Sequence, residues 1–272
     1  MKHLDLFSGI GGFALAAKWA GFETVGFCEI EEYPRKVLGK NFPGVPIHQD
    51  IRELDGAIYE GIDIITGGYP CQPFSTAGKR KGQEDDRHLW PEMLRVITQA
   101  RPSWVIAENV TGHVTMGLDS VLTDLESEGY AARPVVIPAI AVDAKHRRDR
   151  VWILGSNPER LRSAQQEREY ERAKKCNGSG ENELAAGAFV GDTKGIEWDE
   201  KQTKNSSYRG ARLQESAGRH GGSSDGGIWI PEPSVGRVVD GLQNRVDRIK
   251  SLGNAIVPQV AYQILSAIRM QG

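Results

Sequence analysis

Short apolar runs alternate with amphipathic stretches through the first 155 residues. Residues at helical spacing predict helices over 11–20, 89–100 and 118–128, with Gly21 suited to cap the first. Continuous apolar runs predict buried strands at 4–7, 24–28, 62–66 and 104–107. This alternation is typical of an α/β fold with helices on both faces of a parallel sheet.

Two later apolar runs, 135–142 and 151–154, predict the last strands, and the alternation ends near Ser156. A final amphipathic helix is predicted over about 255–270. Pro258 is compatible with that helix because it falls in the first turn, where its missing N–H has no intrahelical partner.

The segment 157–227 is rich in Gly, Ser, Glu, Lys and Arg and poor in residues that form a core. Its charges nearly balance, so a solvated insert or a partly disordered loop is one interpretation. We therefore expect one large domain with a smaller appendage, divided as 1–155, 156–234 and 235–272.

Composition is that of an ordinary globular protein, with 39% hydrophobic residues and a net charge of -2 over 272 residues. The longest apolar run, 135–142, is interrupted by Pro138 and is too short for a bilayer, so no membrane association is expected. Asp5 lies where a secretory signal needs an apolar stretch, which predicts a cytoplasmic protein. The three cysteines lack zinc or disulfide spacing, so we expect no metal.

A glycine-rich turn, Gly9 to Gly12, lies between the first predicted strand and helix. Missing side chains would let a ligand approach the backbone there, although a tight turn needed only for packing is the alternative. Glu29 follows Gly9 by twenty residues, the place of the acid that receives ribose hydroxyls in nucleotide-binding βαβ units. Asp50 ends the next unit similarly.

A cysteine between two prolines, Pro70-Cys71-Gln72-Pro73, follows the predicted strand 62–66. Prolines restrict this loop, and nearby cations (Lys79, Arg80, Lys81 and Arg87) would lower the thiol pKa from about 8.5. Cys71 is therefore a candidate nucleophile, whereas Cys28 and Cys176 are interpreted as packing residues.

The strand 104–107 delivers Glu108 to the same edge of the sheet. A carboxyl in a dry pocket has a raised pKa and can donate a proton, although acids at strand ends are often helix caps or solvated loop residues. Its pairing with Cys71 favours the catalytic interpretation.

These segments, in this order, resemble the cytosine-5 DNA methyltransferases of bacteria and phages, whose signatures are the Pro-Cys-Gln and Glu-Asn-Val elements. The resemblance covers about 1–155 and 235–272. It implies a Rossmann-like sheet that binds S-adenosyl-L-methionine. Residues 145–151 resemble the Gln-x-Arg-x-Arg element, with Arg148 and Arg150 as site arginines and His146 in place of the glutamine. Residues 253–258 resemble the closing motif, which contains Asn254.

The resemblance implies three groups of site residues. The catalytic residues are Cys71, Glu108, Arg148 and Arg150. The cofactor-binding residues are Phe7, Gly9, Ile10, Gly11, Gly12, Glu29, Ile30, Asp50, Ile51, Pro70, Leu89 and Asn254. The DNA-binding residues are Gln72, Ser75, Lys79, Arg80 and Arg237. Tyr69 stands where a proline is frequent, and Ile30 where a bulky aromatic is common.

The implied activity is methyl transfer to carbon 5 of a flipped cytosine in double-stranded DNA, through an adduct of Cys71 at carbon 6. Segment 156–234 occupies the place of the target-recognition region, a role inferred from position. We expect a monomer, and a cognate restriction enzyme is a candidate partner. An RNA methyltransferase, a DNA-binding protein without activity and a nicotinamide-dependent dehydrogenase remain as alternatives.

Overall fold

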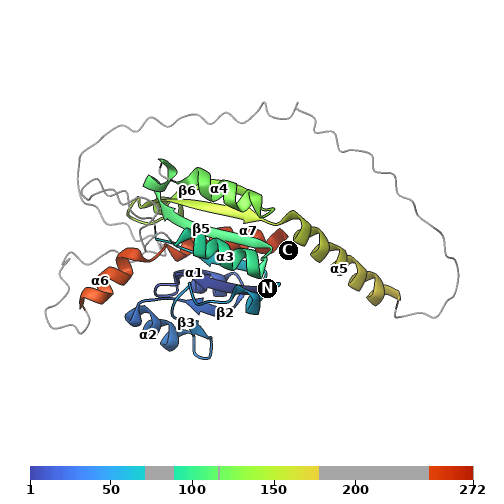
Figure 1. Ribbon diagram of the computed structural model, residues 1–272, viewed down its shortest axis with the longest axis horizontal. Coiled ribbons are helices and arrows are strands. Elements are labelled where there is room, and N and C mark those ends of the chain that lie inside the picture. The colour runs from blue at the N-terminus through green and yellow to red at the C-terminus, as the bar shows by residue number, and fades with distance from the viewer. Residues whose placement is uncertain (71–88, 116, 178–244, 272) are drawn as a thin grey trace, which may run out of the picture. The chain divides into compact units, whose positions relative to one another are not determined.

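The computed structural model describes residues 1–70, 89–115, 117–177 and 245–271 (Figure 1). The elements below belong to the unit formed by Met1–Glu171 and Gly227–Gly272, apart from the end of one helix, α5, which continues into a second unit, Arg172–Gly226. The predicted division at 156 and 234 stays a prediction.

The described residues contain a seven-stranded sheet in the order β3-β2-β1-β4-β5-β7-β6. Five strands are parallel: β1 (Lys2–Leu6), β2 (Glu23–Cys28), β3 (Ile47–His48), β4 (Ile64–Gly67) and β5 (Trp104–Val110). The last two, β6 (Ala131–Pro138) and β7 (Asp149–Ser156), run antiparallel to their neighbours. The predicted α/β class is confirmed, but the prediction of a parallel sheet is wrong for these last two strands.

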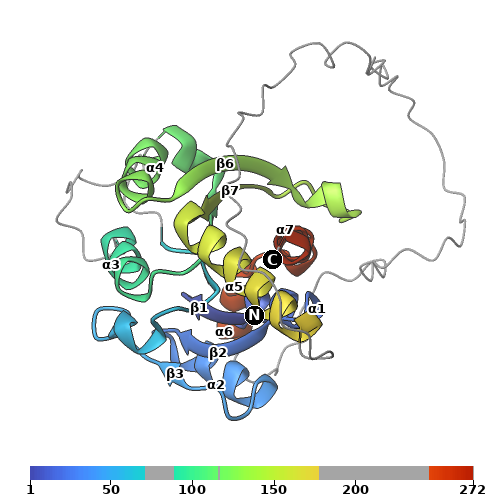
Figure 2. The ribbon, with the colours of Figure 1, turned by 90° about the vertical axis from the view of Figure 1, so that its right-hand side faces the viewer.

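Helices cover both faces of this sheet, as Figure 2 shows. One face carries α3 (Trp90–Ala100) and α4 (Leu118–Ser127), which pack on β1, β4 and β5. The other carries α1 (Gly12–Trp19) and α7 (Pro258–Gln271), whose apolar residues pack around Trp152. Beyond β2, α2 (Glu32–Asn41) adds Leu38 to a small cluster with Phe27. Burial of these apolar stripes holds the layers together.

Short 3-10 turns connect several elements: η1 (Gly56–Tyr59), η2 (Thr111–Thr115) and η3 (Ala139–Val142). The last corrects the strand expected over 135–142, because β6 ends at Pro138. Proline has no N–H for the ladder, so pairing with β7 stops there. The strand begins earlier than expected, at Ala131, and so contains Pro134. Proline is tolerated there because β6 lies at the edge of the sheet, where one side of the strand has no ladder partner.

Three of the described helices were not predicted, and the first is α2, which has few apolar residues. α5 (Pro158–Asn177) lies in the segment expected to be irregular, and α6 (Arg245–Asn254) lies just before the predicted C-terminal helix. The helix α5 has no apolar stripe, so periodicity could not detect it. Its start does carry a local signal, because the Asn157 carboxamide accepts from the Arg160 N–H and Pro158 occupies the first turn.

Candidate functional site

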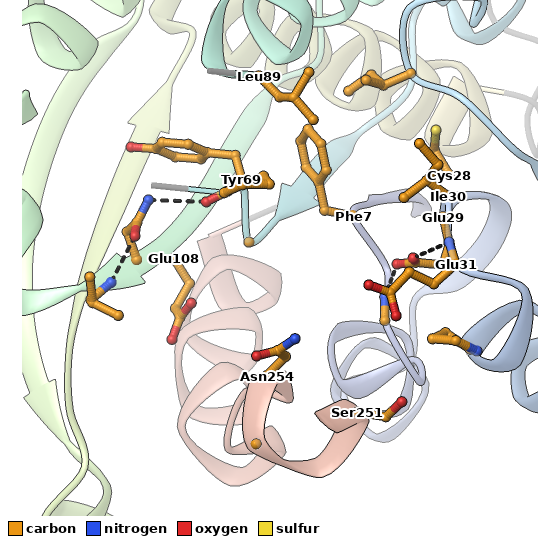
Figure 3. A pocket seen from close by; sticks show the side chains of 18 of the residues that line it. Phe7, Cys28, Glu29, Ile30, Glu31, Tyr69, Leu89, Glu108, Ser251 and Asn254 are labelled. Carbon is orange, nitrogen blue, oxygen red and sulfur yellow. Dashed lines mark hydrogen bonds between the residues drawn. The ribbon is translucent and has the colours of Figure 1, made fainter. Parts of the chain in front are cut away.

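A cavity of about 470 Å³ opens at the carboxyl ends of the parallel strands (Figure 3). Ligands of open α/β sheets bind at this edge. Most residues predicted for the site line the cavity: Phe7, Gly9, Glu29, Ile30, Asp50, Ile51, Pro70, Leu89, Glu108, Arg148, Arg150 and Asn254. The fold therefore brings together side chains separated by up to 247 positions in sequence, from Phe7 to Asn254.

Glu29 follows β2 directly and is held by backbone groups. One carboxylate oxygen accepts the N–H of Gly9 at 2.7 Å, and the other accepts the N–H of Glu31 at 2.8 Å. Burial raises the pKa of this carboxyl, and the two backbone donors oppose the shift. The first bond ties the glycine-rich turn to the end of β2, and Gly9 adopts a φ of +52° that suits glycine.

Apolar side chains form part of the wall near Glu29. Phe7, Ile30 and Leu89 lie around the cavity in Figure 3, and Ile30 is 59% exposed. A cavity that combines apolar walls with a few oriented polar groups is typical of a small-molecule site.

Glu108 lies within β5 and pairs with Arg150 from β7. The register places Trp152 opposite Glu108, so Arg150, two residues away, is its diagonal neighbour on the same face. The Arg150 Nε lies 2.9 Å from the Glu108 Oε1. Burial raises the Glu108 pKa, and the nearby Arg150 and Arg148 charges lower it in part.

Arg148 has a different set of partners. Its Nη2 donates to the carbonyls of Gly253 and Ala255, both at 2.8 Å. These carbonyls lie at the end of α6 and just beyond it, where backbone acceptors lack helical partners. A φ of +35° at Arg148 marks a strained backbone, so this residue joins the start of β7 to the C-terminal segment.

The C-terminal segment contributes one wall of the cavity through Ser251, Gly253 and Asn254. A second tether joins it to the rest of the site, because the Lys250 Nζ lies 2.6 Å from the Glu31 Oε1. Both side chains of this pair are largely exposed, so its contribution to stability is small.

Three residues predicted to surround a cofactor do not line the cavity: Ile10, Gly11 and Gly12. Gly11 has a φ of +87°, and a Cβ there would lie 3.0 Å or less from Phe42 and Leu38 side-chain atoms. A Cβ on Gly12 would lie 2.7 Å from Ile256. These two glycines therefore permit the turn and the close packing of α1. Their predicted part in cofactor binding stays a prediction.

Several predicted site residues lie outside the described residues: Cys71, Gln72, Ser75, Lys79, Arg80 and Arg237. Their predicted roles stay predictions. Of the other cysteines, Cys28 is a buried free thiol, and burial raises its pKa to about 12. A thiol that stays protonated at neutral pH is a poor nucleophile, which agrees with a packing role for Cys28.

The sequence reasoning missed part of the lining, including Gln49, Tyr69, Asn109, Ser251 and Gly253. Four of them are adjacent to a predicted site residue, and Ser251 lies three positions from Asn254. Tyr69, Asn109 and Gly253 belonged to recognised motifs, whereas Gln49 and Ser251 carried no motif signal. Within the described residues no group of His, Cys, Asp and Glu could hold a metal ion, and no helix is long and apolar enough to cross a membrane.

The family description C-5 cytosine-specific DNA methylase matches residues 1–226. The chain belongs to this family. It is 36% identical over 168 residues to the Type II methyltransferase M2.BsuMI of Bacillus subtilis, a match that covers 57% of this chain and 42% of the relative. It is 41% identical over 110 residues to the Type II methyltransferase M.NgoMIV of Neisseria gonorrhoeae, covering 40% of this chain and 35% of that one.

Solved structures agree with this family. A protein assigned as a DNA modification methyltransferase and encoded within an Escherichia coli prophage is 28% identical with a TM-score of 0.51, covering 58% of this chain and 47% of that chain. DNMT2 of Spodoptera frugiperda, 24% identical with a TM-score of 0.51 over 57% of this chain and 50% of its own, shares the fold. The chain spans about two fifths of the length of the curated relatives it matches. The family resemblance and the Rossmann-like methyltransferase fold predicted from the sequence are confirmed.

Proposed function

We propose that this protein transfers a methyl group from S-adenosyl-L-methionine to carbon 5 of cytosine in double-stranded DNA. The observation that carries the proposal is the placement of Glu108, paired with Arg150, in the same cavity as Glu29 and Asn254. Family membership supports the same chemistry. We further propose segment 156–234 as the target-recognition region, a role that rests on its position.

The cavity suits the proposed cofactor. Its volume of about 470 Å³ falls within the roughly 300–1,000 Å³ usual for small-molecule sites. Glu29 is held as an acceptor for ribose hydroxyls, because two backbone N–H groups fix both of its oxygens. Phe7, Ile30 and Leu89 offer apolar surface for a flat base. When bound, S-adenosyl-L-methionine supplies an electrophilic methyl group on a sulfonium sulfur.

The roles of the chain's own residues follow from the chemistry of cytosine, whose carbon 5 does not attack a methyl donor unaided. The Cys71 thiolate adds to carbon 6 and forms a carbon–sulfur bond, and the electron pair moves toward ring nitrogen 3. A protonated Glu108 donates to that nitrogen, which stabilises the enamine. Its raised pKa favours the protonated form that this step needs.

Carbon 5 then takes the methyl group and forms a carbon–carbon bond, and the electron pair of the broken sulfur–methyl bond stays on the cofactor sulfur. Loss of the carbon 5 proton, for which water is the simplest acceptor, returns the electron pair to the ring, and the carbon–sulfur bond breaks to release the thiolate. Arg150 orients the Glu108 carboxyl throughout, whereas Arg148 holds the C-terminal wall of the cavity. The target base must leave the duplex stack, at a cost of a few kcal/mol. Lys79, Arg80 and Arg237 are the proposed phosphate contacts that offset this cost.

Bisulfite sequencing tests the activity and its specificity together. DNA is taken from a host without cytosine methylation that expresses either this protein or its Cys71→Ala variant. Protected cytosines in a recurrent sequence, absent with the variant, are the expected result. Full protection by Cys71→Ala would contradict the covalent mechanism.

A binding measurement separates the steps. The Cys71→Ala variant should bind S-adenosyl-L-methionine within about threefold of the natural chain, because its thiol is proposed to contact cytosine and not the cofactor. A methylation assay with transfer RNA in place of DNA distinguishes the two nucleic acids as substrates. Methylation of transfer RNA alone would replace the proposed substrate.

A further inference from the structure

Tyr69 lies between β4 and Pro70 and is held by its ring and its hydroxyl. The residue is 4% exposed. Its hydroxyl shares a hydrogen bond of 2.7 Å with the Nε2 of His113, which lies in η2. The two rings meet edge to face, with centroids 5.5 Å apart, and the Tyr69 ring also packs at 5.0 Å against Trp90 of α3. Two different elements therefore fix this side chain.

The backbone of Tyr69 is held as well. The carboxamide nitrogen of Asn109 donates to the Tyr69 carbonyl at 3.1 Å, and its oxygen accepts the N–H of Val110 at 2.9 Å, both drawn in Figure 3. Trp90 is itself anchored, because its indole N–H donates to Asp124 at 2.8 Å. Asn109 is adjacent in sequence to Glu108. The residue after Glu108 thus holds the residue before Pro70.

The hydroxyl is not required to fill the core. A phenylalanine ring would occupy the same space between Trp90 and His113 without placing a polar group in a buried position. A buried hydroxyl destabilises the folded state unless it is hydrogen-bonded, so the folded chain requires the Tyr69–His113 bond. Its effect is to define one orientation of the ring and of the chain that leads to Pro70.

We propose that Tyr69 and His113 are positioning residues for the proposed methyl transfer. The inference rests on the proposed function and deepens it. Pro70 and Glu108 both line the cavity, and Cys71 follows Pro70 in the sequence. The hydrogen bonds of Tyr69 set the position of Pro70 relative to Glu108, and therefore the point from which the Cys71 segment starts. Glu29 and the C-terminal wall, which are proposed to bind the cofactor, lie outside this set of contacts, whereas Pro70 and Leu89 adjoin it.

The first test is Tyr69→Phe in the full chain, which removes one oxygen and keeps both ring contacts. We expect kcat for DNA methylation to fall about tenfold, as one lost hydrogen bond to a charged or polar partner allows. The dissociation constant for S-adenosyl-L-methionine should stay within twofold. A kcat equal to that of the natural chain, or an equal loss in cofactor affinity, would overturn the proposal.

Tyr130→Phe is the matched control. Tyr130 is also 4% exposed, and its hydroxyl donates to the Pro102 carbonyl at 2.9 Å near the opposite ends of the strands. Both variants lose a buried, hydrogen-bonded hydroxyl group, and both should lose thermal stability. Only Tyr69→Phe should lose kcat at a temperature where both are folded. An equal kcat loss in the two variants would indicate a structural effect alone.

A pair of His113 substitutions tests the partner. His113→Gln can still hydrogen-bond the Tyr69 hydroxyl, whereas His113→Leu cannot. Recovery of kcat toward the natural value in the glutamine variant, relative to leucine, is expected. Equal rates in the two variants would contradict the role of the bond.

Hydrogen exchange gives a readout that does not need activity. Amides of the peptide that spans residues 64–75 should exchange faster in Tyr69→Phe than in the natural chain and no faster in Tyr130→Phe. Unchanged exchange in Tyr69→Phe would overturn the positioning role. Faster exchange in a chain that methylates no DNA would instead count against the proposed function alone.

Discussion

Two carboxyls in the cavity are equally buried but are held in different ways. Glu29 and Glu108 are each 8% exposed, and burial raises the pKa of both. Glu29 accepts hydrogen bonds from two backbone N–H groups, which are fixed in place by the fold and carry no net charge. Glu108 is bound by the guanidinium of Arg150, a side chain that another ligand could engage.

From this difference we expect the two carboxyls to have different roles. A carboxyl fixed by backbone donors is a permanent acceptor, suited to neutral hydroxyl groups. Burial favours the protonated form of the second carboxyl, and the nearby arginine favours its ionised form. Such a carboxyl is suited to gain or release a proton during a reaction. Substitutions in the two regions should therefore affect different kinetic constants.

The largest effect is expected from Glu108→Gln. An amide is a much weaker acid than a protonated carboxyl, so its hydrogen bond to ring nitrogen 3 stabilises the enamine less, and kcat should fall by about 10²–10³. The dissociation constant for S-adenosyl-L-methionine, measured by calorimetry, should change less than about threefold. A natural kcat in this variant would remove Glu108 from the mechanism.

Glu29→Gln should produce the opposite pattern. One of the two backbone donors loses its acceptor and the ribose loses a charged partner, so cofactor affinity should weaken by about 10–100-fold. At saturating cofactor, kcat should stay within about threefold. Glu32→Gln, which changes an exposed acid of α2 that does not line the cavity, is the control. Loss of kcat at saturation would mean that the two carboxyls do not divide the work.

Arg150→Gln sharpens the comparison through pH. Burial is the main cause of the raised Glu108 pKa, and Arg150 opposes it, so removing Arg150 should raise that pKa further. If protonated Glu108 is the active form, activity is lost as pH rises through its pKa, and this loss should move to higher pH in the variant. The pH profile of kcat measures the shift, and kcat itself should fall by about tenfold or less. A shift to lower pH would contradict the assignment.

The smallest effect is expected from Lys250→Ala. This substitution breaks the exposed ion pair with Glu31, and exposed pairs contribute little. Cofactor affinity should weaken less than about threefold, and less at high salt, because the pair is screened. A tenfold loss would show that the C-terminal wall depends on this tether more than on the Arg148 hydrogen bonds.

Most of the layered fold followed from local pattern. Apolar runs located β2, β4 and β5, and helical spacing located α3 and α4 within one or two residues. The exceptions have local causes: α5 is helical without an apolar stripe, and β6 ends where Pro138 removes an N–H. Pattern reasoning detects burial, so a helix without a buried face escapes it.

The sequence by itself determined the identity and order of the chemical groups: a glycine turn followed by Glu29, a proline-flanked cysteine, and an acid at the end of a buried strand. Motifs of this kind are local, because a turn or a strand end needs only its neighbours. The tertiary structure decided which of these groups meet. Arg150 reaches Glu108 because β7 is antiparallel, Gly12 packs on Ile256 and does not line the cavity, and Asn109 holds Tyr69 across 40 positions. Such contacts depend on strand register and on side-chain packing between distant segments, which no local pattern encodes.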